Sequence, residues 1–118
     1  MLITLYGLKN CDTCRKALKW LDAQGIAHRF HDIRADGLGP DQISAWTSAL
    51  GWEAVLNRRS TTWRQLGEAE RAGLDEARAV ALMAAHPTLI KRPVIDTDGG
   101  FLVGFTKETE AELAKVPG

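Results

Sequence analysis

The pattern of apolar and polar positions predicts a strand, a helix and a second strand at the start of the chain. An apolar, β-prone run covers residues 2–6, a helical pattern covers 13–24, and an alternating pattern covers 27–33. Glycines follow the first strand and the helix, as is typical of element ends. A strand this close behind a helix indicates a βαβ unit with parallel strands.

The middle of the chain has a helical period, and the end returns to strands. Helices are predicted at 41–50, near 63–66 and at 75–85. Strands at 93–95 and 101–103 flank a turn at Asp98, Gly99 and Gly100, and Thr106 heads a last helix. We therefore predict one α/β domain over 1–118, with a mixed sheet from 1–36 and 88–118 and a helical insertion at 37–87.

Composition narrows the function classes. Fifteen basic residues balance fifteen acidic ones, so the chain lacks the positive charge with which proteins bind nucleic acid directly. No apolar run approaches the roughly 20 residues that cross a membrane, and no signal peptide is evident. We expect a cytoplasmic protein without a membrane partner, in which two cysteines serve chemistry rather than a disulfide framework.

Cys11 and Cys14 form a CxxC motif where the first strand's loop meets the first helix. Helix amides and the helix dipole favour the thiolate of Cys11 at this place, and Lys9, Arg15 and Lys16 would act in the same direction. Cys14 follows one turn later, so we predict that Cys11 attacks and Cys14 resolves.

The two cysteines have two alternative interpretations, a zinc site and a purely structural role. Zinc needs four ligands, and the remaining candidates are His28, His31 and His86. The first two lie three apart on a predicted strand and so face opposite sides. Two purely structural cysteines are the other alternative, but CxxC near a βαβ unit favours a thioredoxin-like redox site.

Arg92 and Pro93 come directly before the third predicted strand. Pro93 could simply be a strand-start residue. In a thioredoxin-like fold, however, a cis proline faces the cysteine loop, and Arg92 would then offer a planar fork to a carboxylate or oxyanion. The arginines of the 57–64 loop are either a solvated face or a binding site.

Several blocks of sequence resemble the ArsC/Spx/YffB family, and the YffB branch most of all. They are Leu5-Tyr6-Gly7, Asn10-Cys11, Gly51-Trp52, Val55 to Arg58, Thr61 to Arg64, Ile90 to Pro93 and Leu102 to Phe105. The resemblance implies a thioredoxin-like mixed sheet with an inserted helical subdomain. It also implies a thiol reductase with glutathione as cosubstrate. We further expect a monomer with no bound cofactor or metal.

The branches of this family differ at a few positions. Arsenate reductases use three arginines around the oxyanion; Arg92 matches one, whereas Asn57 and Phe105 stand at the other two. Cys14, by contrast, matches the redox switch of Spx-type regulators, and Arg59 aligns with a position associated with binding the RNA polymerase α subunit.

We therefore predict a glutathione-linked reductase with Cys11, Cys14 and Arg92 as its catalytic residues. The alternatives are a redox-switched, RNA polymerase-binding regulator and an arsenate reductase. The predicted substrate-binding residues are Lys9, Asn10, Arg15, Arg58, Arg59 and Pro93.

Overall fold

The computed structural model describes residues 3–97 and 100–115, which form two compact units. The sheet unit comprises the described residues of Met1–Gly37 and Arg92–Gly118, and the helical unit comprises Leu38–Lys91. Leu2, Asp98 and Gly99, which belong to the predicted first strand and turn, lie outside the described residues. Within the described ranges, no helix has the length and apolar character needed to cross a membrane.

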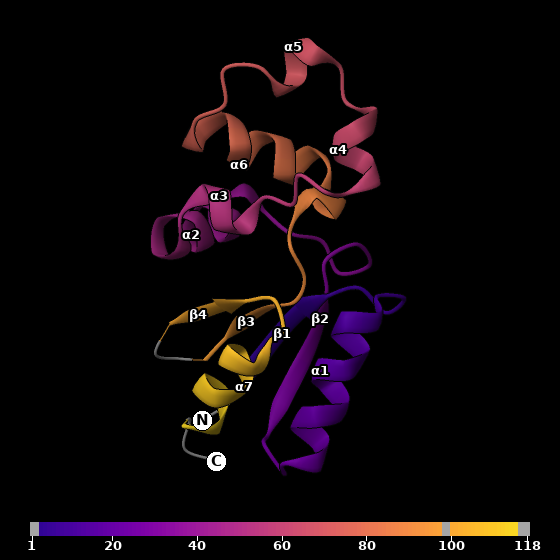
Figure 1. Ribbon diagram of the computed structural model, residues 1–118, viewed down its shortest axis with the longest axis vertical. Coiled ribbons are helices and arrows are strands. Elements are labelled where there is room, and N and C mark those ends of the chain that lie inside the picture. Colours follow the sequence, from indigo (N-terminus) through magenta and orange to yellow (C-terminus); the bar gives the residue numbers. More distant parts are fainter. Residues whose placement is uncertain (1–2, 98–99, 116–118) are drawn as a thin grey trace. The chain divides into compact units, whose positions relative to one another are not determined.

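The sheet unit contains a four-stranded mixed sheet in the order β2-β1-β3-β4 (Figure 1). Its strands are β1 (Ile3–Gly7), β2 (His28–Asp32), β3 (Val94–Asp96) and β4 (Phe101–Val103). β1 pairs in parallel with β2 and antiparallel with β3, and β4 pairs antiparallel with β3. Helix α1 (Asp12–Ala23) connects the two parallel strands, which confirms the predicted βαβ unit.

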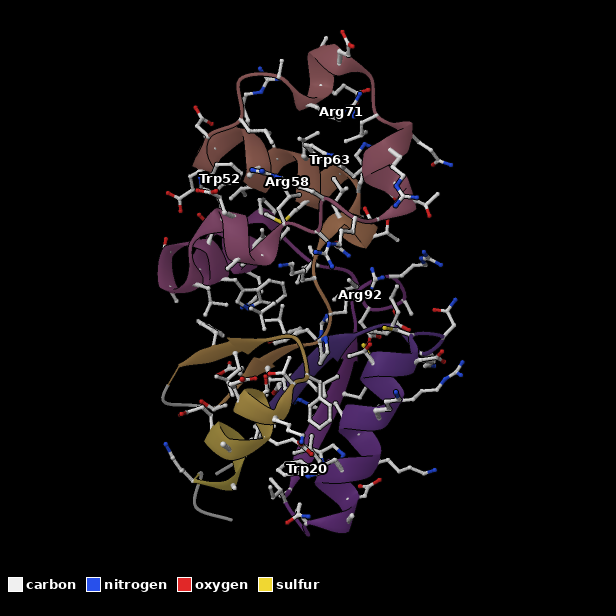
Figure 2. All side chains as sticks on the ribbon, in the orientation of Figure 1. Trp20, Trp52, Arg58, Trp63, Arg71 and Arg92 are labelled. Atoms are coloured by element: carbon white, nitrogen blue, oxygen red, sulfur yellow. The ribbon has the colours of Figure 1, made fainter. Side chains whose placement is uncertain are left out.

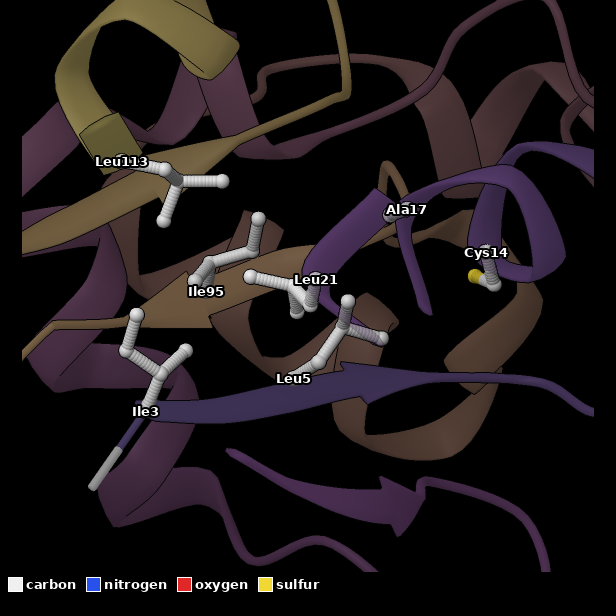
Figure 3. Close-up of a cluster of buried hydrophobic side chains, with 7 residues drawn as sticks. All are labelled: Ile3, Leu5, Cys14, Ala17, Leu21, Ile95 and Leu113. Atoms are coloured by element: carbon white, nitrogen blue, oxygen red, sulfur yellow. The ribbon is translucent and has the colours of Figure 1, made fainter. Parts of the chain in front are cut away.

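One face of this sheet carries the core of the unit. Leu5 of β1 pairs with Ile95 of β3, and both side chains are fully buried. Helices α1 and α7 (Lys107–Ala114) pack on this face, since the same cluster includes Ile3, Cys14, Ala17, Leu21 and Leu113 (Figure 3). Burial of a large aliphatic side chain contributes about 1.5–3 kcal/mol. Cys14 is therefore a core residue as well as a thiol.

The helical unit is built from short helices around a buried tryptophan. The helices are α2 (Pro40–Leu50), α3 (Trp52–Val55), α4 (Thr61–Gln65), α5 (Glu68–Arg71), α6 (Glu76–Ala85) and the 3₁₀ helix η1 (Pro87–Leu89). Trp46 and Ile43 of α2 are fully buried, as are Ala79 and Met83 of α6, so apolar packing between α2 and α6 holds the unit together. The sequence predicted α2, α4 and α6 but not the other three.

Residues 88–91 belong to the helical unit, although the sequence placed them with the sheet. Leu56 and Ile90 form an isolated antiparallel bridge. On either side, the amide of Asn57 donates to the carbonyl of Leu89 at 2.7 Å, and the amide of Lys91 donates to the carbonyl of Val55 at 2.8 Å. A bridge of this length leaves no periodic pattern in the sequence, so the boundary shifts from residue 88 to residue 92.

Candidate active site

Cys11 is the residue that begins helix α1, as the sequence predicted. Its amide donates to the carbonyl of Leu8 at 3.2 Å, and its carbonyl accepts from the amide of Arg15 at 3.0 Å. The first bond closes the loop after β1, and the second belongs to the first turn of the helix. Together they hold the Cys11 sulfur at the amide end of α1.

Three groups around the Cys11 sulfur favour its thiolate. Partial burial acts to raise the pKa of Cys11, but hydrogen bonds from the amide and the thiol of Cys14, and the guanidinium of Arg92, outweigh it. The pKa of Cys11 consequently lies below its ordinary value of 9.0. Arg92, rather than Lys9, Arg15 or Lys16, supplies the principal positive charge.

Cys14 has the opposite character. Its side chain is fully buried, and burial, reinforced by the adjacent Cys11 sulfur, raises the pKa of Cys14 to about 12. At neutral pH Cys14 is therefore a neutral thiol whose S–H donates to Cys11. The two cysteines are free thiols in different states: Cys11 favours the thiolate, and the buried thiol of Cys14 donates a hydrogen bond to it.

Gly7 makes room for Cys14 at the end of β1. A Cβ atom at position 7 would overlap with Sγ of Cys14 and lie 3.3 Å from its Cβ. The site therefore needs a residue without a side chain here for reasons of space. The sequence showed Gly7 as a strand end but gave no sign of this contact, which joins residues seven apart.

The peptide bond between Arg92 and Pro93 is cis, as predicted. Pro93 is buried, and its carbonyl accepts a hydrogen bond from the amide of Gly104 at 2.8 Å. The turn after β4 therefore holds this proline in place. Arg92, directly before it, is half-buried and reaches Cys11.

The other predicted binding residues of the sheet unit surround the cysteine loop. Lys9 and Asn10 are exposed beside Cys11. Arg15 is also exposed, but its Nε donates to the carbonyl of Lys9 at 3.0 Å and its Nη1 to Asp12 at 3.4 Å. Arg15 thus connects the loop that precedes Cys11 to helix α1.

Arg58 and Arg59 lie in the helical unit. They line a cavity of about 360 Å³ together with Glu53, Leu56, Asn57 and Lys91. The guanidinium of Arg58 lies 5.4 Å from the ring centre of Trp52, close enough for a cation–π contact (Figure 2). This cavity carries three cations and one carboxylate, which makes it positive.

Phe105 is an apolar, partly buried residue of the sheet unit. Its ring meets that of Trp20 edge to face at 5.9 Å, and both pack against the core of the sheet unit. In the arsenate reductases that the sequence resembles, an arginine is expected at the position of Phe105 and at the position of Asn57. The described structure thus offers Arg92 alone among the three.

Comparisons with known proteins agree with this picture. The ArsC family model matches residues 6–113. A protein of Haemophilus influenzae described as uncharacterized is 48% identical over 114 residues, 96% of this chain and 100% of the relative. The solved structure of the YFFB protein aligns with a TM-score of 0.91 at 46% identity, covering 98% of this chain and 99% of that one.

The more distant relatives include transcriptional regulators. The global transcriptional regulator Spx of Streptococcus mutans is 26% identical over 109 residues, which cover 91% of this chain and 79% of the regulator. The mixed sheet with its cysteine loop is a thioredoxin-like fold. With the family model matching nearly the whole chain, the protein belongs to the ArsC family.

Proposed function

We propose that this protein is a glutathione-linked thiol–disulfide reductase in which Cys11 is the nucleophile. The observation that carries the proposal is the set of groups around its sulfur: the amide and thiol of Cys14 and the guanidinium of Arg92. They favour the thiolate, which is the species that attacks disulfides. Cys11 is also partly exposed, so a substrate can reach it.

The first step is thiol–disulfide exchange. The Cys11 thiolate attacks a sulfur of a mixed disulfide between glutathione and a substrate thiol. The substrate's S–S bond breaks, a new bond forms between Cys11 and the glutathione sulfur, and the substrate leaves as a thiolate that takes a proton from water. Arg92 lies beside the reacting sulfur and would stabilise negative charge there.

The second step removes glutathione from Cys11. Once Cys11 is in a disulfide, its sulfur carries no charge and no longer opposes ionisation of Cys14. Cys14 then attacks Cys11, its proton passes to the departing glutathione thiolate, and two further glutathione molecules reduce the resulting disulfide. Alternatively, one glutathione attacks the adduct directly and leaves as glutathione disulfide.

Binding roles for Lys9, Asn10 and Pro93 around Cys11 fit this proposal, because all three belong to the sheet unit that contains the nucleophile. The roles predicted for Arg58 and Arg59 stay predictions. So do the monomeric state and the cytoplasmic location.

Replacement of the nucleophile tests the function. We expect Cys11→Ser to lose at least a hundredfold in turnover of a glutathionylated peptide, because a hydroxyl at this place is not ionised at neutral pH. Cys14→Ala is the matched control, since it keeps the nucleophile and can still be resolved by glutathione. Full turnover by Cys11→Ser would refute the proposal.

A second candidate function is a redox-switched regulator that contacts RNA polymerase. Its support is the Cys11–Cys14 pair together with the 26% identity to an Spx regulator. A pull-down with the purified RNA polymerase α subunit, using reduced and oxidised protein, tests it. Binding in one redox state would favour the regulator, and no binding in either state would exclude this second function.

Arsenate reduction has no comparable support, because Asn57 and Phe105 stand where two oxyanion arginines are expected.

A further inference from the structure

We propose that a surface pocket formed by Lys9, Asn10 and Arg34 beside Cys11 binds a carboxylate of the thiol or disulfide substrate. The inference rests on the proposed function for its biological meaning and names the substrate class. Arg34 was not singled out by the sequence. The structure places Arg34 in the same pocket as Lys9 and Asn10, which the sequence did indicate as binding residues.

The pocket shares a wall with the nucleophile's loop. It has a volume of about 330 Å³ and is lined by Leu8, Lys9, Asn10, Asp32, Arg34 and Ala35. Asn10 directly precedes Cys11, whose amide is bonded to the carbonyl of Leu8. A ligand in this pocket therefore lies against the loop that carries Cys11, within one compact unit.

The topology of the sheet brings the two cations together. Lys9 follows β1, and Arg34 follows β2, the parallel neighbour of β1. The two strands end in register at Gly7 and Asp32, and the amide of Ile33 donates to the carbonyl of Gly7 at 3.0 Å. The carboxyl ends of parallel strands are where ligands commonly bind in α/β proteins.

Both cations are available to a ligand. Lys9 and Arg34 are exposed, and neither side chain forms a hydrogen bond or ion pair anywhere in the described ranges 3–97 and 100–115. In contrast, Arg15 on the neighbouring helix is engaged with Lys9 and Asp12.

The acidic groups near the pocket are occupied by backbone amides. Asp32 Oδ1 accepts from the amides of Arg34 at 2.8 Å and Ala35 at 2.9 Å, and Asp36 Oδ2 accepts from the amide of Asp32 at 3.1 Å. The hydrogen bonds from the amides of Ala35 and Arg34, and then the charges of Lys9 and Arg34, lower the pKa of Asp32. Asp32 therefore shares the pocket with both cations, and its Oδ1 already accepts two backbone amides.

The donor set matches a carboxylate. A guanidinium offers two parallel donors to the two oxygens of a carboxylate, and an ammonium and an amide can complete the set. Glutathione carries two carboxylates, whereas a disulfide of cysteamine carries none. The pocket would therefore favour acidic peptide thiols over neutral or cationic ones.

Alkylation of Cys11 tests the pocket without any enzyme assay. The Cys11 thiolate attacks the CH2 carbon of iodoacetate or iodoacetamide, an S–C bond forms and iodide leaves, but only iodoacetate carries a carboxylate. The ratio of their rates in a Cys14→Ala background cancels changes in the thiolate fraction. We expect Lys9→Gln and Arg34→Gln each to lower this ratio by about twofold to fivefold, the range typical of one exposed charge pair.

Arg29→Gln is the matched control. Arg29 is an exposed arginine on β2 that does not line the pocket, and its replacement changes the net charge by the same amount. We expect it to leave the ratio unchanged. A double Lys9→Gln, Arg34→Gln variant with the wild-type ratio, or an equal fall in the control, would overturn the proposal.

Turnover then separates the pocket from the proposed function. We expect Arg34→Gln to raise KM for a glutathionyl mixed disulfide but not for the corresponding cysteamine mixed disulfide. An equal change for both substrates would count against the pocket. If the wild type turned over neither substrate, the reductase proposal would fail while the alkylation ratio still decided the carboxylate site.

Discussion

The thiol of Cys14 combines two roles that substitution can separate. It donates a hydrogen bond to Cys11, and in the proposed reaction it also resolves the mixed disulfide. Serine keeps a donor at this position but cannot form a disulfide, whereas alanine loses both. We therefore expect the pKa of Cys11 to rise in Cys14→Ala and to stay near the wild-type value in Cys14→Ser, as measured by the pH dependence of alkylation. Equal pKa values in the two variants would contradict a donor role.

The contact between Gly7 and Cys14 predicts a strong coupling between the two positions. Alanine at position 7 would place its Cβ against Sγ of Cys14, so we expect Gly7→Ala to reduce the free energy of unfolding by about 1–3 kcal/mol, a typical cost of overpacking. Cys14→Ala removes the obstructing sulfur, and most of that cost should disappear in the double variant. Urea unfolding of the four proteins measures the coupling, and additive effects would contradict the contact.

At the scale of elements, the hydrogen bond from Arg15 to the carbonyl of Lys9 connects α1 to the loop that precedes Cys11. We expect Arg15→Ala to speed hydrogen exchange of the Cys11 amide by about twofold to tenfold, because one hydrogen bond contributes about 0.5–1.5 kcal/mol. Lys16→Ala is the control, since Lys16 is exposed on the same helix and makes no hydrogen bond within the described residues. Equal exchange rates in both variants would argue against this role for Arg15.

The sequence predicted the four strands and helices α1, α2, α4, α6 and α7, but not the one-turn elements α3, α5 and η1. The four strands, α1, α2, α6 and α7 follow periods of two or 3.6 residues and have recognisable ends, such as the Thr106 side chain that accepts from the amide of Thr109. In contrast, α3, α5 and η1 are one turn long, too short for a period to show.

The residues of the candidate site also divide into those that the sequence predicted and those that it did not. Cys11 and Cys14 form a local motif, and the cis bond before Pro93 could be predicted once the thioredoxin-like context was recognised. Gly7 and Arg34 could not be found, because Gly7 matters through its contact with Cys14 of α1 and Arg34 through the pairing of β1 with β2, and neither contact is local in the sequence. The charge beside Cys11 was expected from residues near it in the chain, whereas Arg92 supplies it across the sheet unit.

For the whole molecule, the opposite pKa shifts of the two cysteines predict how stability depends on pH. The pKa of Cys11 is lower in the folded protein than its ordinary value of 9.0, so its contribution rises with pH up to about 9 and is lost as pH falls through the folded value. Cys14 holds its proton up to about pH 12 in the folded protein, so its contribution is lost between about pH 9 and 12. The pair should therefore stabilise the reduced protein most near pH 9.

The difference in free energy of unfolding between the reduced wild type and a Cys11→Ser, Cys14→Ala double variant isolates this effect, because the other titrating groups are common to both. Urea unfolding from pH 6 to 11 in a phosphine reductant should show a difference that rises and then falls. Cys11→Ser alone should retain only the falling limb, and Cys14→Ala only a rising limb, which is smaller than in the wild type because the thiol donor to Cys11 is lost. A difference that stays flat across this range would mean that folding shifts the pKa of neither thiol, and the division between thiolate and donor would then be wrong.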